Sequence, residues 1–171
     1  HLPFVHHHIP GGDAMTRAPM QEEVRDRSYR LVRTGKLPWT PFHDKMWGPE
    51  HRYEGLANFV SLTDFYGPEF IRTGMPIFTD VPGHAEVPAA LGTLHILHGM
   101  TPETATSTHY FGFSTRNYRI GDAELDEFQL QSDIMIRQQD VIAINAVEER
   151  VDYGASIARE LLAKADAPAI K

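Results

Sequence analysis

The stretch 125–151, LDEFQLQSDIMIRQQDVIAINAVEERV, most constrains how this chain can fold, because it keeps the hydrophobic period of a helix over its whole length. At that period one face of the helix is apolar from Ile136 onward, with the exception of Asp140. This face consists of Leu125, Gln129, Ser132, Ile136, Asp140, Ile144, Val147 and Val151. The opposite face carries residues suited to water, namely Arg137, Gln138, Glu148, Glu149 and Arg150. The sequence therefore predicts one long helix with one buried face, and Asp122 is its expected N-cap.

Asp140 is the exception on that apolar face. A buried carboxylate is costly unless it is paired, hydrogen-bonded or bound to a metal. Structural carboxylates of this kind outnumber metal ligands, so the pattern by itself favours a basic or backbone partner for Asp140. Metal binding is the second interpretation, and it requires further ligands from elsewhere in the chain.

The composition is that of one globular domain, with 171 residues of which 42% are hydrophobic and 23% charged. A net charge of −7 argues against nucleic acid or an anionic membrane as the main partner. We find neither an apolar run of membrane-spanning length nor a secretory signal, so a cytoplasmic location is expected. Since the chain has no cysteine, any metal that it binds must rest on imidazole and carboxylate groups.

Strands are expected before the long helix, over 24–35, 56–65, 69–78, 90–98 and 104–114. Turns are expected at 66–68, 80–86 and 101–103, a long connection over 36–54, and a short closing helix over 156–165. A short helical or irregular piece should end near His8, with a loop and no helix after Gly11-Gly12. Strands grouped before helices predict an α+β fold, in which a curved antiparallel sheet grips the long helix around a cavity.

The second set of candidate ligands lies at the start of the chain, among ten histidines. His1 and His6 are separated by five residues, which is not the spacing that aligns two ligands on an ideal helix. Together with Asp140 they would nevertheless complete two histidines and one carboxylate, a set that leaves positions on Fe(II) open for dioxygen. His7 and His8 are rival ligands or plain surface residues, and the run of three could also be a tag remnant.

Other residues could contact a ligand in the cavity. His95, within an apolar strand, is either a core histidine bonded to a backbone carbonyl or a polar group that orients a substrate oxygen. Aromatic residues on the strands are usually core, but a cavity for an aromatic ligand would use the same ones, which are Tyr66, Phe70, Phe111 and Phe113. Motifs for serine hydrolases, phosphate-binding loops and HExxH zinc sites are absent from the sequence.

Three blocks of the sequence resemble the C-terminal catalytic domain of Rieske non-haem iron oxygenases, in the branch that contains vanillate O-demethylase and dicamba monooxygenase. HLPFVH at 1–6 resembles the family's histidine pair, Asp-x-x-His-x4-His. HILHGMTPETATSTHYFGF at 95–113 resembles its HIL-TPET-HYFF block, with an apparent insertion at 98–100. QDVIAINAVEER at 139–150 resembles its Glu-Asp-x-x-x-x-Glu helix, with Asn145 where Glu is common.

The resemblance implies a helix-grip (START/Bet v 1-like) fold and Fe(II) held by His1, His6 and Asp140. It implies a substrate contact at His95, beside which Tyr66 and Phe111 are the expected aromatic contacts. Residues 1–171 would then be an N-terminally incomplete catalytic domain, because the family's bridging acid would precede residue 1 and its Rieske domain is absent from this chain.

The resemblance also implies the partners. Electrons from NAD(P)H would arrive through a ferredoxin and/or a reductase and a Rieske [2Fe–2S] cluster, between neighbouring subunits of a homotrimer. Dioxygen and a small aromatic substrate would react by hydroxylation or O-demethylation, although this chain alone should not turn over. Two other functions stay open: a metal-free helix-grip module for an apolar ligand, and a metal-dependent hydrolase that uses the same three residues.

Overall fold

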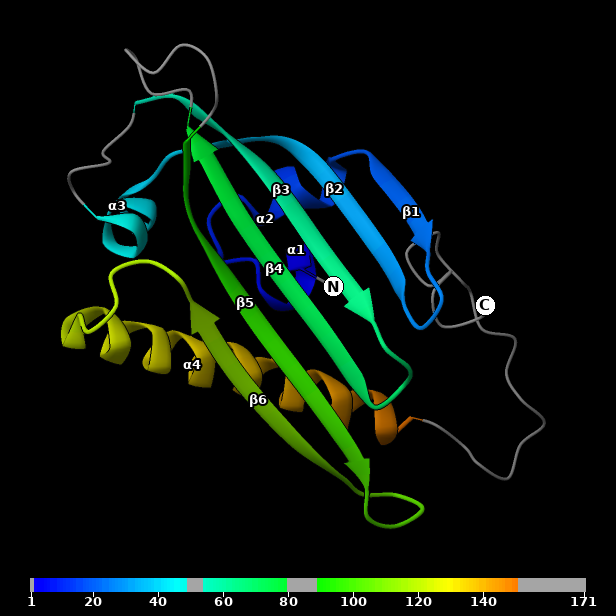
Figure 1. Ribbon diagram of the computed structural model, residues 1–171. Helices are drawn as coiled ribbons and strands as arrows, with labels where there is room; N and C mark the ends of the chain where they lie inside the picture. Colours follow the sequence, from blue (N-terminus) through cyan, green and yellow to red (C-terminus); the bar gives the residue numbers. More distant parts are fainter. Residues whose placement is uncertain (1, 49–53, 80–88, 151–171) are drawn as a thin grey trace.

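The computed structural model describes residues 2–48, 54–79 and 89–150, and in them six strands form one antiparallel sheet in chain order (Figure 1). Helices gather on one face of this curved sheet, where the long helix α4 crosses beneath β5 and β6. The predicted α+β helix-grip class is confirmed. The elements are α1 (Leu2–Val5), α2 (Gly12–Arg17), β1 (Met20–Val24), β2 (Tyr29–Pro38), α3 (Pro41–Trp47), β3 (Leu56–Phe65), β4 (Phe70–Thr79), β5 (Ala89–Pro102), β6 (Thr108–Arg116) and α4 (Ala123–Glu148).

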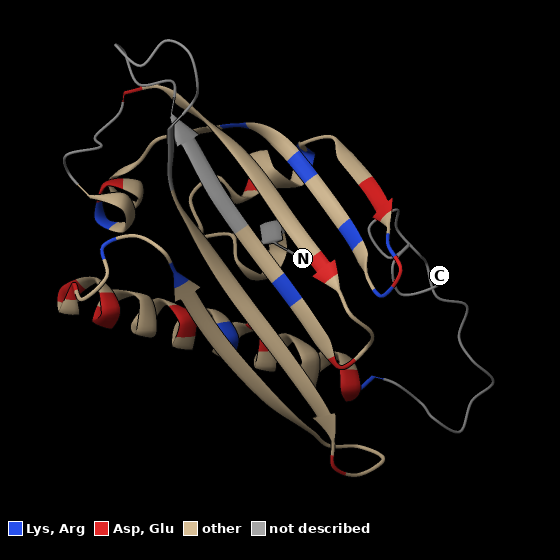
Figure 2. Cartoon of the chain, in the orientation of Figure 1, with Lys and Arg blue, Asp and Glu red and all other residues tan. Residues whose placement is uncertain are grey.

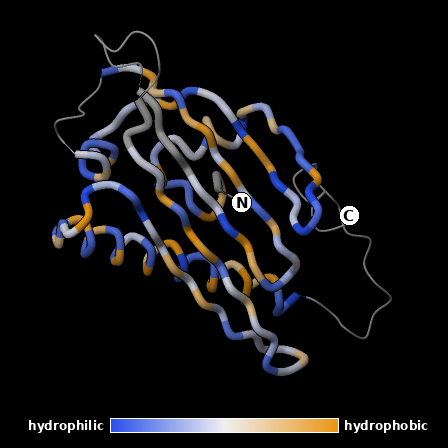
Figure 3. The backbone as a smooth tube through the Cα atoms, viewed as in Figure 1, coloured by the Kyte–Doolittle hydropathy of each residue, from blue (hydrophilic) through white to orange (hydrophobic). Residues whose placement is uncertain are grey.

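The two faces of the sheet follow from its register, because residues directly opposite each other point to the same side and neighbours along a strand alternate. Thr73 pairs with Ile96, and both face the helices, where they line a cavity. Asp64 pairs with Arg72, which pairs with Leu97, so these three lie on the outer face. Figure 3 shows hydrophobic positions spread along the central strands and along α4.

The long helix begins where the sequence predicts. Asp122 is the N-cap, since its Oδ1 accepts a hydrogen bond of 3.0 Å from the backbone N–H of Leu125. Leu125 is 1% exposed and packs with Trp47 and Tyr118 in the main core cluster. Among the described helices, none combines the length and hydropathy needed to cross a bilayer.

The two faces of α4 differ in part from the prediction. Arg137, expected at the solvent face, lies against the sheet, where a Cβ added at Gly112 would collide with its guanidinium group. Ile144 and Val147, expected in the core, are 64% and 62% exposed. For Ile144 the physical reason is that it lines a cavity between this half of the helix and strands β5 and β6.

The strand predicted over 24–35 is confirmed from Tyr29 onward as part of β2, but its start is wrong, because β1 ends at Val24 and a hairpin turn joins it to β2. This turn is closed by a hydrogen bond of 2.9 Å from the backbone N–H of Arg25 to the carbonyl of Ser28. Arg25, Asp26 and Arg27 are three consecutive charged residues, and they break the alternation of a strand at this turn.

Two short helices also depart from the prediction. The connection expected over 36–54 contains α3, whose start is capped by Thr40 in a capping box with His43. Gly11-Gly12 does precede a helix, α2, because Gly11 adopts a φ of 81° that a glycine supplies at no steric cost.

The remaining strands agree with the prediction to within their ends. The hairpin at 66–68 is confirmed by a bond of 3.0 Å from the Tyr66 N–H to the Phe70 carbonyl. β5 continues to Pro102, so the turn expected at 101–103 lies instead at 103–107 and β6 begins at Thr108 rather than at 104. The turn expected at 80–86 and the helix expected over 156–165 lie outside the described residues.

On the outer face, charged residues of opposite sign lie on the neighbouring strands β2, β3 and β4 (Figure 2). The Asp64 carboxylate is fully buried between two guanidinium groups, with Arg30 Nε at 2.5 Å from Oδ1 and Arg72 Nε at 2.9 Å from Oδ2. Burial acts to raise the pKa of Asp64, but the hydrogen bonds and charges of Arg30 and Arg72 together outweigh it, so the pKa is lowered. The three strands are therefore joined by an ion triad.

Replacing Asp64 with alanine should destabilise the domain by about 3–5 kcal/mol, because two guanidinium groups would lose their counter-charge beneath the surface of the sheet. Since the pKa of Asp64 is lowered, this stabilisation is fully present above the ordinary value of 3.8 and is lost as the pH falls through the lowered value. Urea unfolding across that pH range measures both effects. Asp13→Ala, which removes an exposed pair with Arg17, is the control and should change little. Equal effects of the two substitutions would contradict this account.

Candidate metal centre

The two ends of the described chain meet at His6 and Asp140. His6 follows α1, is 3% exposed and packs against the C-terminal half of α4. Its Nε2 lies 2.9 Å from Asp140 Oδ1, and the Asp140 side chain is 32% exposed. An imidazole nitrogen and a carboxylate oxygen held together in this way are donors that a divalent transition metal accepts.

Gln139 fixes which nitrogen of His6 faces the carboxylate. The amide oxygen Oε1 of Gln139 lies 3.0 Å from His6 Nδ1. Because an amide oxygen only accepts, Nδ1 donates its hydrogen to Gln139, and Nε2 is the nitrogen left to pair with Asp140 or to bind a metal in its place. The amide nitrogen of Gln139 lies 3.4 Å from His8 Nδ1, so one side chain contacts two of the three consecutive histidines.

The third expected ligand, His1, lies outside the described residues. Within the part of the chain that is described, no three His, Asp or Glu side chains form a group able to hold a metal. His7 and His8 are exposed, unlike His6, and the His8 ring meets the His6 ring edge-on at 6.5 Å. The structure thus brings together two of the three predicted ligands, and the ligand roles themselves stay predictions.

A cavity of about 710 Å³ adjoins Asp140, between the C-terminal half of α4 and the ends of β5 and β6. Its lining includes apolar side chains from both sides, namely Met100, Val141 and Ile144. Its lining also includes a polar pair that was not predicted from the sequence, His98 and Tyr110, whose Nδ1 and hydroxyl oxygen lie 2.6 Å apart. These groups can orient a ligand beside Asp140.

Burial lowers the pKa of His98, and the positive charge of Arg137 lowers it further against the opposing carboxylates of Asp140 and Asp133. The imidazole is therefore neutral near pH 7. Each nitrogen of a neutral ring has one hydrogen-bonding role, and Tyr110 already occupies Nδ1. Nε2 is left to serve a ligand.

The predicted substrate contacts lie elsewhere. His95 alternates with Leu94 and Ile96, which line a cavity under the sheet, so its ring lies on the outer face beside Gly74. Phe111 shares that outer face and is 51% exposed, and Tyr66 is 40% exposed at the turn between β3 and β4. The structure does not bring these residues to the cavity beside Asp140, and their predicted role gains no support from it.

His98 could have been found from the sequence by one signal. It stands three residues after His95, and an odd number of residues along a strand places two side chains on opposite faces. Once Ile96 is known to face the helix, His98 must face it as well.

The comparisons with known proteins decide the family. The model of the vanillate O-demethylase oxygenase C-terminal domain family matches residues 1–171. The chain belongs to this family. It is also 30% identical over 157 residues to the iron-sulfur subunit TsaM1 of the toluene-4-sulfonate monooxygenase system of Comamonas testosteroni. This alignment covers 87% of the chain and 44% of the relative, so the chain spans less than half of that relative's length.

Family membership confirms the resemblance that the three sequence blocks indicate. Two of those blocks contain residues at the site: 1–6 includes His6, and 139–150 includes Gln139 and Asp140. The chain is therefore a C-terminal oxygenase domain of this family.

The His98 imidazole should titrate below its ordinary pKa of 6.5 in the metal-free protein. Arg137→Gln should raise that pKa, because it removes a nearby positive charge, and Asp140→Asn should lower it further by removing a negative one. The NMR signal of the imidazole Cε1–H, followed against pH, measures all three. A shift of either variant in the other direction would show that His98 does not sit between these charges.

Proposed function

We propose that this chain is the mononuclear iron domain of a Rieske-type oxygenase that hydroxylates or O-demethylates a small aromatic compound. The observation that supports it most is the pairing of His6 Nε2 with Asp140 Oδ1 at 2.9 Å, in a member of this family. His1, His6 and Asp140 would hold Fe(II) as two imidazoles and one carboxylate. Iron bound there would supply the activation of dioxygen.

The chemistry of the three proposed ligands suits Fe(II). It combines imidazole and carboxylate without thiolate, which suits iron(II) with open positions. Gln139 keeps Nε2 of His6 on the side of Asp140. Asp140 is partly exposed to the adjoining cavity, so a substrate can approach the same point.

The substrate would occupy the cavity beside Asp140, whose volume of about 710 Å³ is in the usual range for a small-molecule site. Apolar walls suit an aromatic ring, and His98 Nε2 can hydrogen-bond a polar substituent. The toluene-4-sulfonate of the relative's name is an aromatic compound with such a substituent, which agrees with this assignment. The role of the walls is to place one bond of the substrate beside the metal and to exclude water.

Electrons would come from a Rieske [2Fe–2S] cluster outside this chain, which has no cysteine to hold one. NAD(P)H, through a ferredoxin and/or a reductase, would reduce that cluster. The relative is named as the iron-sulfur subunit of a monooxygenase system, which supports a multi-component arrangement. We propose a homotrimer in which a neighbouring subunit's cluster serves this domain.

Asp140→Ala and His6→Ala should each abolish stoichiometric Fe(II) binding while leaving most of the fold intact, because each removes one of three ligands. His7→Ala is the matched control, since His7 is exposed, and should keep about one iron per chain. Elemental analysis and anaerobic Fe(II) titration measure the binding, and circular dichroism checks the fold. Iron retained by the Asp140 variant would refute the ligand assignment.

Gln139→Leu should weaken Fe(II) affinity about 10–100-fold, because the His6 ring would lose the group that sets its tautomer and orientation. Gln139→Glu keeps an acceptor oxygen opposite Nδ1 and should restore most of the affinity. Competition with a metal-sensing dye measures both variants. Equal affinities in the leucine and glutamate variants would mean that Gln139 does not orient the ligand.

The second candidate function is a metal-free module that binds an apolar ligand. The direct pairing of Asp140 with His6 is the observation in its favour, because such a pair satisfies the carboxylate without an ion. The iron titration separates the two functions. Absence of iron from the wild-type chain, expressed within its full reading frame, would favour the binding module.

A further inference from the structure

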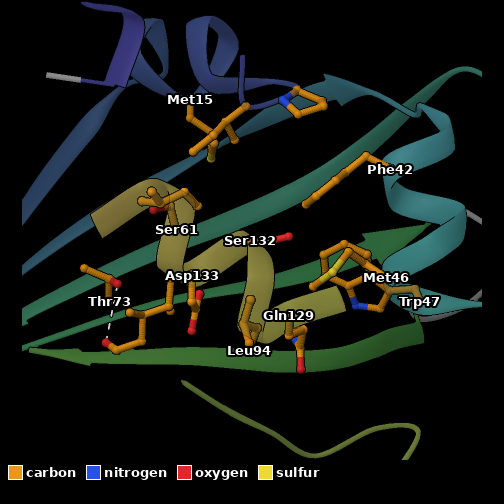
Figure 4. Close-up of a pocket in the computed structure, with 15 residues that line it drawn as sticks. Met15, Phe42, Met46, Trp47, Ser61, Thr73, Leu94, Gln129, Ser132 and Asp133 are labelled. Atoms are coloured by element: carbon orange, nitrogen blue, oxygen red, sulfur yellow. Dashed lines mark hydrogen bonds between the residues drawn. The ribbon is translucent and has the colours of Figure 1, made fainter. Parts of the chain in front are cut away.

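The apolar side chains of α4 become more exposed toward its C-terminal end. Near the start of the helix Leu125 is 1% exposed, and Gln129 lines a pocket together with Trp47 of α3 (Figure 4). Beyond Asp140 the exposed fractions of four apolar side chains are far larger, at 52% for Val141, 69% for Ile142, 64% for Ile144 and 62% for Val147. The end of the helix thus presents a cluster of apolar residues.

These four side chains point in different directions around the helix axis, because each residue turns the helix by about 100°. This half of α4 therefore has the sequence of a helix that is covered on more than one side. Ile142, the most exposed of the four, follows Asp140 by two residues and so points away from the side that faces the sheet. The sheet cannot cover Ile142, and another part of the protein must do so.

The chain itself continues from this end of the helix. α4 is described to its last turn, where the backbone N–H of Arg150 donates to the Val147 carbonyl at 2.9 Å, and the segment 151–171 follows directly. Within that segment, 156–165 has the sequence SIARELLAKA. At helical period its apolar residues fall on one side and Arg159 and Glu160 on the other; the apolar residues are Ile157, Ala158, Leu161, Leu162 and Ala165.

We propose that residues 156–165 form a helix that packs antiparallel on α4 and covers the side that carries Ile142. The connection, 151–155, contains a glycine and has the length usual between antiparallel helices. Counted from the middle of that connection at residue 153, Leu162 is level with Ile144, and Leu161 lies within one turn of Ile142. Leucine side chains therefore meet α4 where its apolar residues are exposed.

The short connection favours this segment over a second copy of the chain. It holds residues 156–165 near α4 at an effective concentration in the millimolar range. A second copy at micromolar concentration would bind the same apolar side chains far less often. The polar side of the segment, with Arg159 and Glu160, would face water and leave the surface of the domain charged.

Because the chain has no cysteine, Ala163→Cys accepts a single nitroxide label on the polar side of the segment. The axes of packed helices are about 8–10 Å apart, which brings the label close enough to broaden NMR signals from α4. The methyl signals of Ile142 and Ile144 should lose most of their intensity and regain it when the nitroxide is reduced. Ile120, which is exposed before the start of α4, is the internal reference and should be unchanged.

Variants of the labelled chain separate packing from mere proximity. Leu161→Asp places a carboxylate on the apolar side of the segment and should restore most of the Ile142 signal. Arg159→Asp places the same group on the polar side, so it is the matched control and should keep the broadening. Shortening the unlabelled chain after Arg150 should accelerate amide exchange over 141–147 by about tenfold or more, because these turns lose their cover. The methyl spectrum of the sheet checks folding in each variant.

Undiminished Ile142 and Ile144 signals in the labelled chain would overturn the proposal, as would equal broadening in Leu161→Asp and Arg159→Asp. A mixture of nitroxide-labelled chains with isotope-labelled chains that carry no nitroxide tests for a second copy. Broadening in that mixture as strong as within one chain would place the segment on a neighbouring copy and overturn the intramolecular contact. Because all measurements use the metal-free protein, their outcome is independent of the iron assignment at His6 and Asp140.

Discussion

The Arg116 guanidinium holds the long helix against the sheet, and the space under the sheet depends on that joint. From the end of β6 it donates to the backbone carbonyls of Tyr118 and Arg119, at 3.1 and 3.0 Å. It also reaches the first turns of α4, through Asp126 at 2.6 Å and Gln129 at 2.6 Å. Its side chain is only 10% exposed, so these bonds are little weakened by water. These bonds fix the relative positions of the end of β6, the loop that follows it and the first turns of α4.

From that joint, the helical period places polar residues under the sheet at successive turns. Gln129 lines the pocket beside α3, and Asp140 lines the cavity at the ends of β5 and β6. Between them Asp133 accepts from the Ser114 hydroxyl and from Arg137, which lies over Gly112. This polar layer lies under β6, and it needs a glycine at 112 because any Cβ would collide with the guanidinium. A single helix therefore supplies polar groups at several points under the sheet.

The pairing of His6 with Asp140 depends on both ends of the chain. His6 is buried because α1 packs on α2 and α4, and Gln139, next to Asp140, orients the ring. Taken alone, His6 is a histidine close to an apolar segment, and Asp140 is a carboxylate on a helix face. Their 2.9 Å approach gives them a common chemistry, which family membership connects with oxygenases.

The sequence by itself determined what local period and local chemistry control. It placed α4 and its Asp122 cap, the hairpin between β3 and β4, the α+β order and the family blocks around His6 and Asp140. It missed the turn between β1 and β2 and the helix α3, where polar or proline-rich segments are compatible with more than one local structure. Those errors are local and did not change the fold class.

Only the tertiary structure decided which side chains share a space. Alternation along β5 separates His95 from His98, but which of the two faces the helix depends on where α4 packs. The same holds for Arg137, which lies under the sheet although the helical pattern places it in solvent. Local periodicity defines relative orientation within one element, and the packing of one element on another converts it into a site.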